Sequence, residues 1–145
     1  MYIIYVNLYK ISTHQKSPIV VNTVIEIPKS CSQKYEYDPK GYFKYDRSLN
    51  TAMVYPANYG FIPNTIAEDG DALDVILYNQ NPIARGTVVE SRVLGVLDME
   101  DEGLKDYKIL AIPVNHIGMF STFKDAPQSL LKIYKNFFSH YKDLE

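Results

Sequence analysis

Cysteine, tryptophan and histidine are scarce in this chain, which contains one, none and three of them among its 145 residues. The single Cys31 excludes an intrachain disulfide and a cysteine-rich zinc site, which fits a reducing, cytoplasmic setting. His14, His116 and His140 lie far apart without the spacing of metal ligands. We therefore expect surface or structural roles for them and no zinc.

Long apolar runs and an excess of positive charge are also absent. The opening MYIIYVNLY contains Asn7, is followed by Lys10 and lacks the basic start of a leader, so we interpret residues 2–9 as a strand. The formal net charge is −2, whereas nucleic-acid binders usually present a basic face. We expect neither a membrane partner nor a nucleic-acid partner.

Proline and glycine occur singly, without repeats or a linker, which predicts a single domain over residues 1–145. A hydrophobic content of 46% can build a core without disulfides. Apolar residues at helical spacing from Leu130 to Tyr141 predict a helix over 126–142. The expected class is α+β, mainly β, with a barrel-like sheet. Besides 2–9, segments rich in Val, Ile or Tyr predict strands at 20–27, 33–38, 42–47, 73–78, 87–97 and 107–112.

Three carboxylates are crowded in EDGDALDVILY, where Asp69, Asp71 and Asp74 precede an apolar run. Two like charges about 5 Å apart repel by roughly 3 kcal/mol at an effective dielectric of 20, so such crowding favours solvent or a cation between them. A solvated turn is the alternative, because Asp and Gly are ordinary turn residues. A calcium loop is excluded, because Leu73 and Gln80 stand where that loop requires an oxygen ligand and a glutamate.

A second acidic cluster lies in DMEDEGLKDYKILAIP, where Asp101, Glu102 and Asp106 precede another apolar strand that contains Lys108. Two acidic loops that each enter a strand can place their carboxylates at one mouth of a barrel. Hard oxygen ligands suit magnesium or manganese, and magnesium commonly bridges to substrate phosphates. We therefore expect a divalent-cation site beside a phosphate ligand that Lys and Arg side chains balance.

Strand alternation in QKYEYD places Lys34, Glu36 and Asp38 on one face and the two tyrosines on the other. The following PKG predicts a turn into YFKYDR, and the resulting hairpin brings Arg47 back toward the start of its first strand. A solvated hairpin face is the alternative interpretation.

Four further polar side chains are not assigned to a site by their pattern alone. YPANYGFIP is interpreted as an irregular segment in which the rings of Tyr55 and Tyr59 pack in the core while their hydroxyls reach outward. Tyr141 continues the apolar helical stripe, and Lys142 suits a last helical turn, where a cation faces the helix dipole.

The ordered motifs VIEIP, KYE, DR, YPANYGFIP, DGDALDV, GVLDMEDEGLKDYK and HYKDLE resemble those of soluble inorganic pyrophosphatases of family I, bacterial-length type. The resemblance covers roughly residues 20–145. It implies an OB-like five-stranded barrel with a flanking helix or helices, in agreement with the short strands and late helix expected above. It also implies Mg²⁺ as the cofactor, with Mn²⁺ able to substitute.

The same resemblance implies a role for each matching residue. Metal ligands would be Asp69, Asp74, Asp106, Asp101 and Glu36, with Asp74 shared between two ions. Asp71 would be the catalytic base, and Glu26 and Glu102 would support the acidic cluster. The phosphate-binding residues would be Lys34, Arg47, Lys108, Tyr59, Tyr141 and Lys142, with Tyr55 in support and with Tyr59, Lys34 and Arg47 also counted as catalytic.

The activity implied is hydrolysis of inorganic pyrophosphate to two phosphates by a metal-activated water. A homo-oligomer is expected, since bacterial-length members are commonly hexamers. The chain ends at Glu145, where members usually continue through another strand and a helix, so it is interpreted as shortened at the C-terminus. A catalytically inactive shortened paralogue and an OB-type nucleic-acid-binding module are the alternatives.

Overall fold

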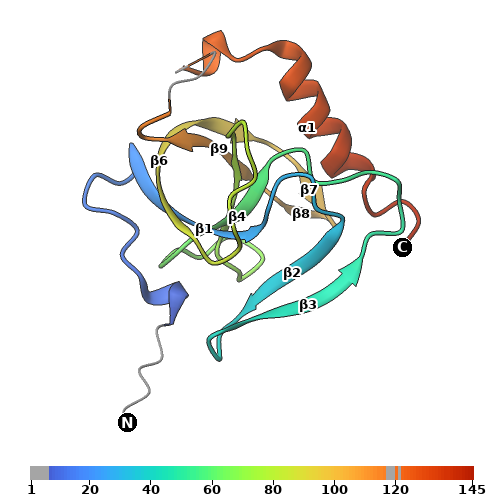
Figure 1. Ribbon diagram of the computed structural model, residues 1–145, viewed down its shortest axis with the longest axis horizontal. Coiled ribbons are helices and arrows are strands. Elements are labelled where there is room, and N and C mark those ends of the chain that lie inside the picture. The colour runs from blue at the N-terminus through green and yellow to red at the C-terminus, as the bar shows by residue number, and fades with distance from the viewer. Residues whose placement is uncertain (1–6, 117–119, 121) are drawn as a thin grey trace.

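Five strands form a closed barrel in the computed structural model, which describes residues 7–116, 120 and 122–145 (Figure 1). Around the ring the order is β1, β4, β5, β9 and β6, and β6 pairs with β1 to close it. β5 and β9 run parallel, and the other neighbours are antiparallel. This OB-like barrel confirms the α+β, mainly-β class. Its strands are β1 (Val20–Ile27), β4 (Asn58–Ile62), β5 (Leu73–Leu77), β6 (Val88–Leu97) and β9 (Lys108–Pro113).

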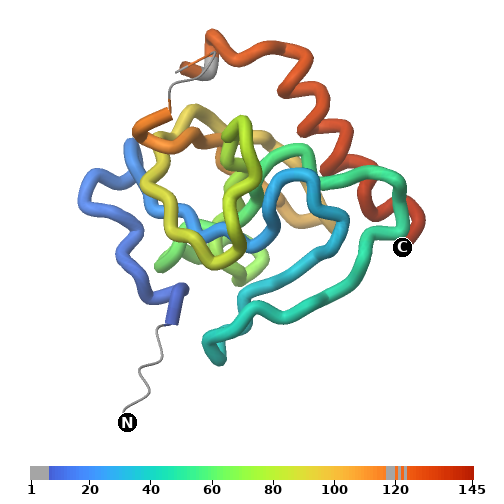
Figure 2. Tube along the Cα trace, viewed as in Figure 1, coloured from blue at the N-terminus to red at the C-terminus, as the bar shows by residue number. Residues whose placement is uncertain are grey.

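Two smaller sheets stand at one side of the barrel. A hairpin of β2 (Gln33–Asp38) and β3 (Tyr42–Ser48) forms its own two-stranded sheet and extends away from the ring (Figures 1 and 2). The very short β7 (Glu100–Asp101) and β8 (Leu104–Lys105) pair with each other. The chain trace in Figure 2 brings the C-terminal end beside the open end of the hairpin.

The α-helix α1 (Gln128–His140) lies along the outside of the barrel (Figure 1). Tyr134, Phe137 and Phe138 are its buried residues, and their three- and four-residue spacing turns them toward one side. They pack on a cluster that includes Ile76 and Leu110 of the barrel wall. Full burial of each such side chain contributes roughly 1.5–3 kcal/mol, so the helix is held by this apolar stripe.

The barrel interior is filled by aliphatic side chains. Val21, Ile25, Val75 and Leu77 are almost fully buried in one cluster. β1 and β4 approach so closely that a Cβ on Gly60 would lie 1.8 Å from the carbonyl oxygen of Val24. Only glycine fits that position without a shift of backbone.

Six of the predicted strands and the predicted helix are confirmed, each to within two residues at its ends. The strand expected at 2–9 is wrong at Leu8 and Tyr9, which belong to a 3₁₀ turn, η1 (Leu8–Lys10). The Asn7 side chain accepts a hydrogen bond from the Tyr9 amide at 3.0 Å and so stabilises the turn. Residues 2–6 lie outside the described part of the chain.

The segment YPANYGFIP, expected to be irregular, contains β4. All five residues of β4 are buried, so no alternation of apolar and polar residues marks it as a strand. The pair β7 and β8 was also not predicted, because two-residue strands produce no pattern. A second 3₁₀ turn, η2 (Phe123–Asp125), precedes α1.

Candidate active site

A cavity of about 290 Å³ opens beside the barrel, between the hairpin, the β7–β8 pair and the segment that follows α1. It brings together every predicted site residue except Arg47, from six of the seven motifs, all but DR. Those lining residues are Glu26, Lys34, Glu36, Tyr55, Tyr59, Asp69, Asp71, Asp74, Asp101, Glu102, Asp106, Lys108, Tyr141 and Lys142. The expected convergence of the two acidic loops is therefore present.

Lys108 lies at the centre of the cavity and is almost fully buried. Its Nζ is 3.1 Å from Oδ2 of Asp74 and 3.1 Å from Oδ2 of Asp106, and it donates to the Tyr59 hydroxyl at 2.7 Å. The parallel ladder between β5 and β9 pairs Asp74 directly with Lys108. The pairing of the two strands thus brings Lys108 and Asp74 close enough to form their ion pair.

Burial and charge act in opposite directions on the pKa values of this cluster. Burial disfavours the charged form of Lys108, but Asp74 and Asp106 outweigh it, and the net pKa of Lys108 is raised. Burial also raises the pKa of Asp74, and Lys108 opposes this only in part. Asp71 has a raised pKa, first from burial and then from its neighbour Asp69. The cavity is therefore one in which negative charge is costly until a cation compensates it.

Lys142 and Lys34, two of the three other lysines that line the cavity, are paired with carboxylates. Lys142 donates to Oδ2 of Asp101 at 2.9 Å, and that hydrogen bond lowers the pKa of Asp101. Lys34 lies 3.0 Å from Oε1 of Glu36 and 3.3 Å from Oδ2 of Asp46. The ammonium groups proposed to bind phosphate are thus held by carboxylates in this structure.

Arg47 lies beside the cavity rather than in its lining. β3 returns antiparallel to β2 and pairs Arg47 with Lys34, as the hairpin prediction expected. Nη1 of Arg47 is 2.6 Å from Oδ2 of Asp46, and Nε is 2.9 Å from Oε2 of Glu145. Its guanidinium group is therefore fixed at the rim by two carboxylates.

A register shift in the hairpin makes the predicted alternation incomplete. Lys34 pairs with Arg47 but Tyr35 pairs with Tyr45, so the hairpin contains a bulge at Asp46. Tyr35 also lines the cavity, next to Lys34, although alternation along β2 placed it on the other face. Ile27, Leu104 and Lys105 also line the cavity and were missed, because they have no distinguishing pattern.

Glu26 lies at an irregularity in β1. β1 pairs with β4 through Ile25 with Gly60 and Ile27 with Tyr59, which leaves Glu26 as the bulged residue. Its Oε2 accepts a hydrogen bond from the Tyr37 amide at 2.8 Å. Burial raises the pKa of Glu26 to about 8, so the side chain is largely protonated at neutral pH.

The tyrosines combine a packed ring with a polar tip, as expected. Tyr55 and Tyr59 are 1% and 9% exposed, and their ring centroids lie 5.5 Å apart. Phe138 places its ring centroid 5.2 Å from that of Tyr59 and 5.1 Å from the Lys108 ammonium. Burial raises the pKa of both tyrosines, so both hydroxyls stay protonated.

The donor set suits a hard divalent cation, since it consists of carboxylate oxygens. In the described residues, no three or more His, Cys, Asp or Glu side chains are already gathered closely enough to hold a metal ion. Between Asp74 and Asp106 the Lys108 ammonium lies where a cation would bridge them. The residues therefore fit a metal ion if it displaces the ammonium groups from the carboxylates.

Within the part of the chain that the structure describes, no helix has the length and apolar character of a membrane span.

A mainly-β barrel with carboxylates and cations interleaved at one cavity has the features that suit a hydrolase acting on a polyanion. Comparison with known proteins identifies its family. A family model described as inorganic pyrophosphatase matches residues 23–145. The chain is 47% identical over 141 residues to the inorganic pyrophosphatase of Aeropyrum pernix, covering 94% of this chain and 80% of that protein. It therefore belongs to the inorganic pyrophosphatase family.

Other relatives agree with this assignment. The inorganic pyrophosphatase of Campylobacter jejuni is 47% identical over 133 residues, which cover 88% of this chain and 77% of that protein. The crystal structure of the inorganic pyrophosphatase from Thermus thermophilus superposes with a TM-score of 0.92 at 42% identity, covering 97% of this chain and 82% of that one. The similarity thus includes both the fold and the ordered motifs.

Proposed function

We propose that this protein hydrolyses inorganic pyrophosphate to two phosphates with the help of bound divalent cations. Family membership supports the reaction, and inorganic pyrophosphatases are generally metal-dependent. The single observation that supports the site best is the placement of Lys108 between Asp74 and Asp106, inside a cavity lined by further carboxylates and lysines. Such an arrangement suits a polyanion bound together with cations.

Mg²⁺, or Mn²⁺ in its place, is the cation we propose, with Asp69, Asp74, Asp101, Asp106 and Glu36 as ligands. When bound, such ions lower the pKa of water and neutralise phosphoryl oxygens. Asp74, which lines the cavity from β5 and shares the Lys108 ammonium with Asp106, is the ligand that we propose is shared by two ions.

Asp71 is the proposed general base. It lies in the exposed turn before β5, where its side chain can reach a water in the cavity. Its raised pKa makes it a better proton acceptor than an ordinary aspartate. Glu26 and Glu102 line the same cavity and support the acidic cluster.

The phosphate groups are bound by the cations around the cavity. Lys34 and Arg47 approach from the hairpin, and Lys142 approaches from the segment after α1. Lys108, Tyr59 and Tyr141 complete the binding set, and Tyr55 supports Tyr59 through ring packing. Binding needs an exchange, in which metal ions take over the carboxylates and the ammonium groups turn to phosphate oxygens.

The two alternative functions are not favoured. An OB-type nucleic-acid-binding module would present basic and aromatic side chains, whereas this cavity is lined by eight carboxylate residues and four lysines. An inactive shortened paralogue is not favoured, because every residue of the implied catalytic set is present and all but Arg47 line one cavity.

We further propose a single-domain protein that forms a homo-oligomer, with a hexamer as the expected form, in the cytoplasm. Size-exclusion chromatography with light scattering tests the assembly, and a stable monomer would contradict it.

The activity itself is tested by phosphate release from pyrophosphate. Release should require magnesium and stop when a chelator is added, and a folded sample that releases no phosphate would refute the proposed function.

A further inference from the structure

Arg85 lies outside the cavity lining, in the segment between β5 and β6, and contacts two strands at once. Its guanidinium carbon is 3.5 Å from the centroid of the Tyr35 ring in β2. Its Nε donates a hydrogen bond to the main-chain carbonyl oxygen of Glu26 in β1 at 2.7 Å. Among the described residues no carboxylate forms an ion pair with Arg85, so its contacts are the ring and the carbonyl.

The hydrogen bond to Glu26 falls at the bulge in β1. Because Glu26 has no partner on β4, Arg85 provides a donor for its otherwise unpaired carbonyl group. The neighbouring backbone is tied in the same place, since the Gly86 amide donates to the Ile25 carbonyl at 2.8 Å. The bulge directs the Glu26 side chain to the cavity, so Arg85 fixes the backbone beneath a cavity residue.

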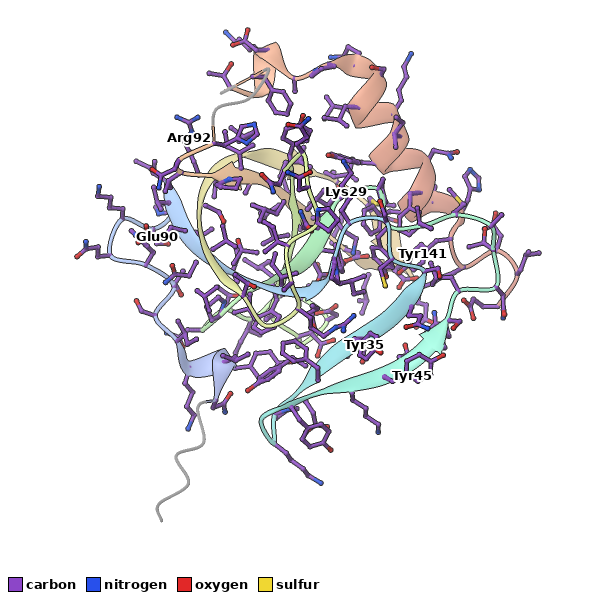
Figure 3. The ribbon with its side chains drawn as sticks, viewed as in Figure 1. Lys29, Tyr35, Tyr45, Glu90, Arg92 and Tyr141 are labelled. Carbon is purple, nitrogen blue, oxygen red and sulfur yellow. The ribbon has the colours of Figure 1, made fainter. Side chains whose placement is uncertain are left out.

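The stack on Tyr35 acts on the hairpin. β2 and β3 form a separate sheet, so no strand ladder holds them to the barrel. Tyr35 lies between Lys34 and Glu36, both of which line the cavity, and Arg47 pairs with Lys34 across the hairpin. Figure 3 shows Tyr35 on β2 of the hairpin with Tyr45 of β3 nearby, and their ring centroids lie 5.5 Å apart. The stack of Arg85 on Tyr35 therefore holds β2 against the barrel together with the hydrogen bond from the Tyr37 amide to Glu26, and it lies next to Lys34.

The geometry points to Arg85 as a positioning residue that fixes the hairpin cations Lys34 and Arg47 relative to the carboxylates of the barrel. The inference rests on the proposed function, because it takes Lys34 and Arg47 as phosphate-binding groups. Arg85 touches neither substrate nor metal in this role. It acts through Tyr35 and through the bulge at Glu26.

The test compares Arg85→Ala, Tyr35→Leu and Tyr35→Phe with the wild type. Removal of either stacking partner should raise the KM for magnesium pyrophosphate about tenfold while kcat falls far less, because the cations are misplaced but the carboxylates and base remain. Tyr35→Phe keeps the aromatic face and should stay close to the wild-type KM. The double variant Arg85→Ala/Tyr35→Leu should be no worse than Arg85→Ala alone, because Arg85→Ala already removes the stacking contact that Tyr35→Leu removes.

Arg92→Ala is the matched control, since Arg92 is a half-buried arginine of β6 that Figure 3 places across the barrel from Tyr35. Its KM should equal that of the wild type. Titration calorimetry with imidodiphosphate and magnesium gives a readout independent of turnover, and Arg85→Ala should bind this analogue about tenfold more weakly.

Three outcomes would overturn the inference. They are an unchanged KM in Arg85→Ala, a Tyr35→Phe variant as impaired as Tyr35→Leu, and additive effects in the double variant. If Arg85→Ala fails to fold, the two Tyr35 variants decide the question. Failure of the proposed function is distinguishable, because it would show as absent phosphate release in the wild type itself.

Discussion

Nζ of Lys108 lies within 3.1 Å of both Asp74 and Asp106, and one strand ladder places Lys108 directly opposite Asp74. The side chain of Lys108 is 4% exposed, and the two carboxylates are 28% and 23% exposed. The lysine therefore balances two charges that would otherwise repel each other in a poorly solvated place. Its removal should affect folding as well as substrate binding.

Lys108→Ala should lower the free energy of unfolding by about 2 kcal/mol in the presence of a chelator, because it leaves Asp74 and Asp106 uncompensated. Magnesium should restore part of the loss, since a cation can replace the ammonium. Urea unfolding with and without magnesium measures both effects. Lys105→Ala, which removes ion pairs of an exposed ammonium group, should leave the stability close to that of the wild type. Equal stability of Lys108→Ala and wild type in chelator would disprove this role.

Asp71→Asn should lower kcat by about 10²–10⁴-fold, because the amide keeps the shape of the side chain but accepts no proton. Magnesium binding should be largely intact. Steady-state phosphate release and magnesium titration calorimetry test the two parts. Asp98→Asn, at an exposed position whose carboxylate pairs with Lys105, is the control and should leave turnover unchanged. Normal turnover in Asp71→Asn would rule out Asp71 as the base.

Asp74→Ala should weaken magnesium binding by about tenfold or more, because it removes a ligand proposed to be shared by two ions. Its effect on affinity should exceed that of Asp71→Asn. Isothermal titration with magnesium measures the affinity, and Asp98→Ala provides a surface carboxylate for comparison. A normal affinity in Asp74→Ala would show that the shared-ligand assignment is incorrect.

Glu26 should make the stability of the metal-free protein depend on pH. Its pKa rises from the ordinary glutamate value of 4.5 to about 8 on folding, mainly through burial. The native state therefore holds a proton that the unfolded state has lost, and the contribution present below about pH 4.5 decreases as pH rises to about 8. The slope should be at most about 1.4 kcal/mol per pH unit in this window.

Urea unfolding in chelator at several pH values between 5 and 8.5 measures this dependence, with Glu26→Gln as the comparison. The uncharged variant keeps the size of the side chain and should lack this part of the slope. The stability difference in favour of Glu26→Gln should therefore grow with pH. A constant difference between the two proteins would indicate that Glu26 does not titrate in this range.

The parts of the fold with strong periodic patterns were predictable, and the exceptions have physical causes. β1, which is rich in Val and Ile, was predicted with its observed bounds, and α1, with its apolar stripe, was predicted to within two residues at each end. β4 was missed because burial on both sides removes alternation, and Gly60 weakens its strand character. The strand expected through Tyr9 was wrong because the local Asn7 cap competes with extended backbone.

The candidate site was predictable to the extent that its residues belong to short motifs. Asp69, Asp71 and Asp74 lie within six positions of one another in the sequence, and all three line the cavity. The contacts of Arg85 were not predictable, since Glu26 and Tyr35 are many positions away and the hydrogen bond depends on a bulge in β1. The ion pairs between lysines and the proposed metal ligands were likewise not predictable, because they depend on how the segments fold together.

The parallel pairing of β5 with β9 determines which substitutions the site can tolerate. A slip of one residue in that alignment would turn Lys108 to the opposite side of its strand and leave Asp74 facing Ile109 or Tyr107. The ion pair between Lys108 and Asp74 therefore depends on the main-chain pairing of these two strands. A mutation that changes no ionisable group but shifts the register between β5 and β9 would abolish activity as completely as loss of Lys108.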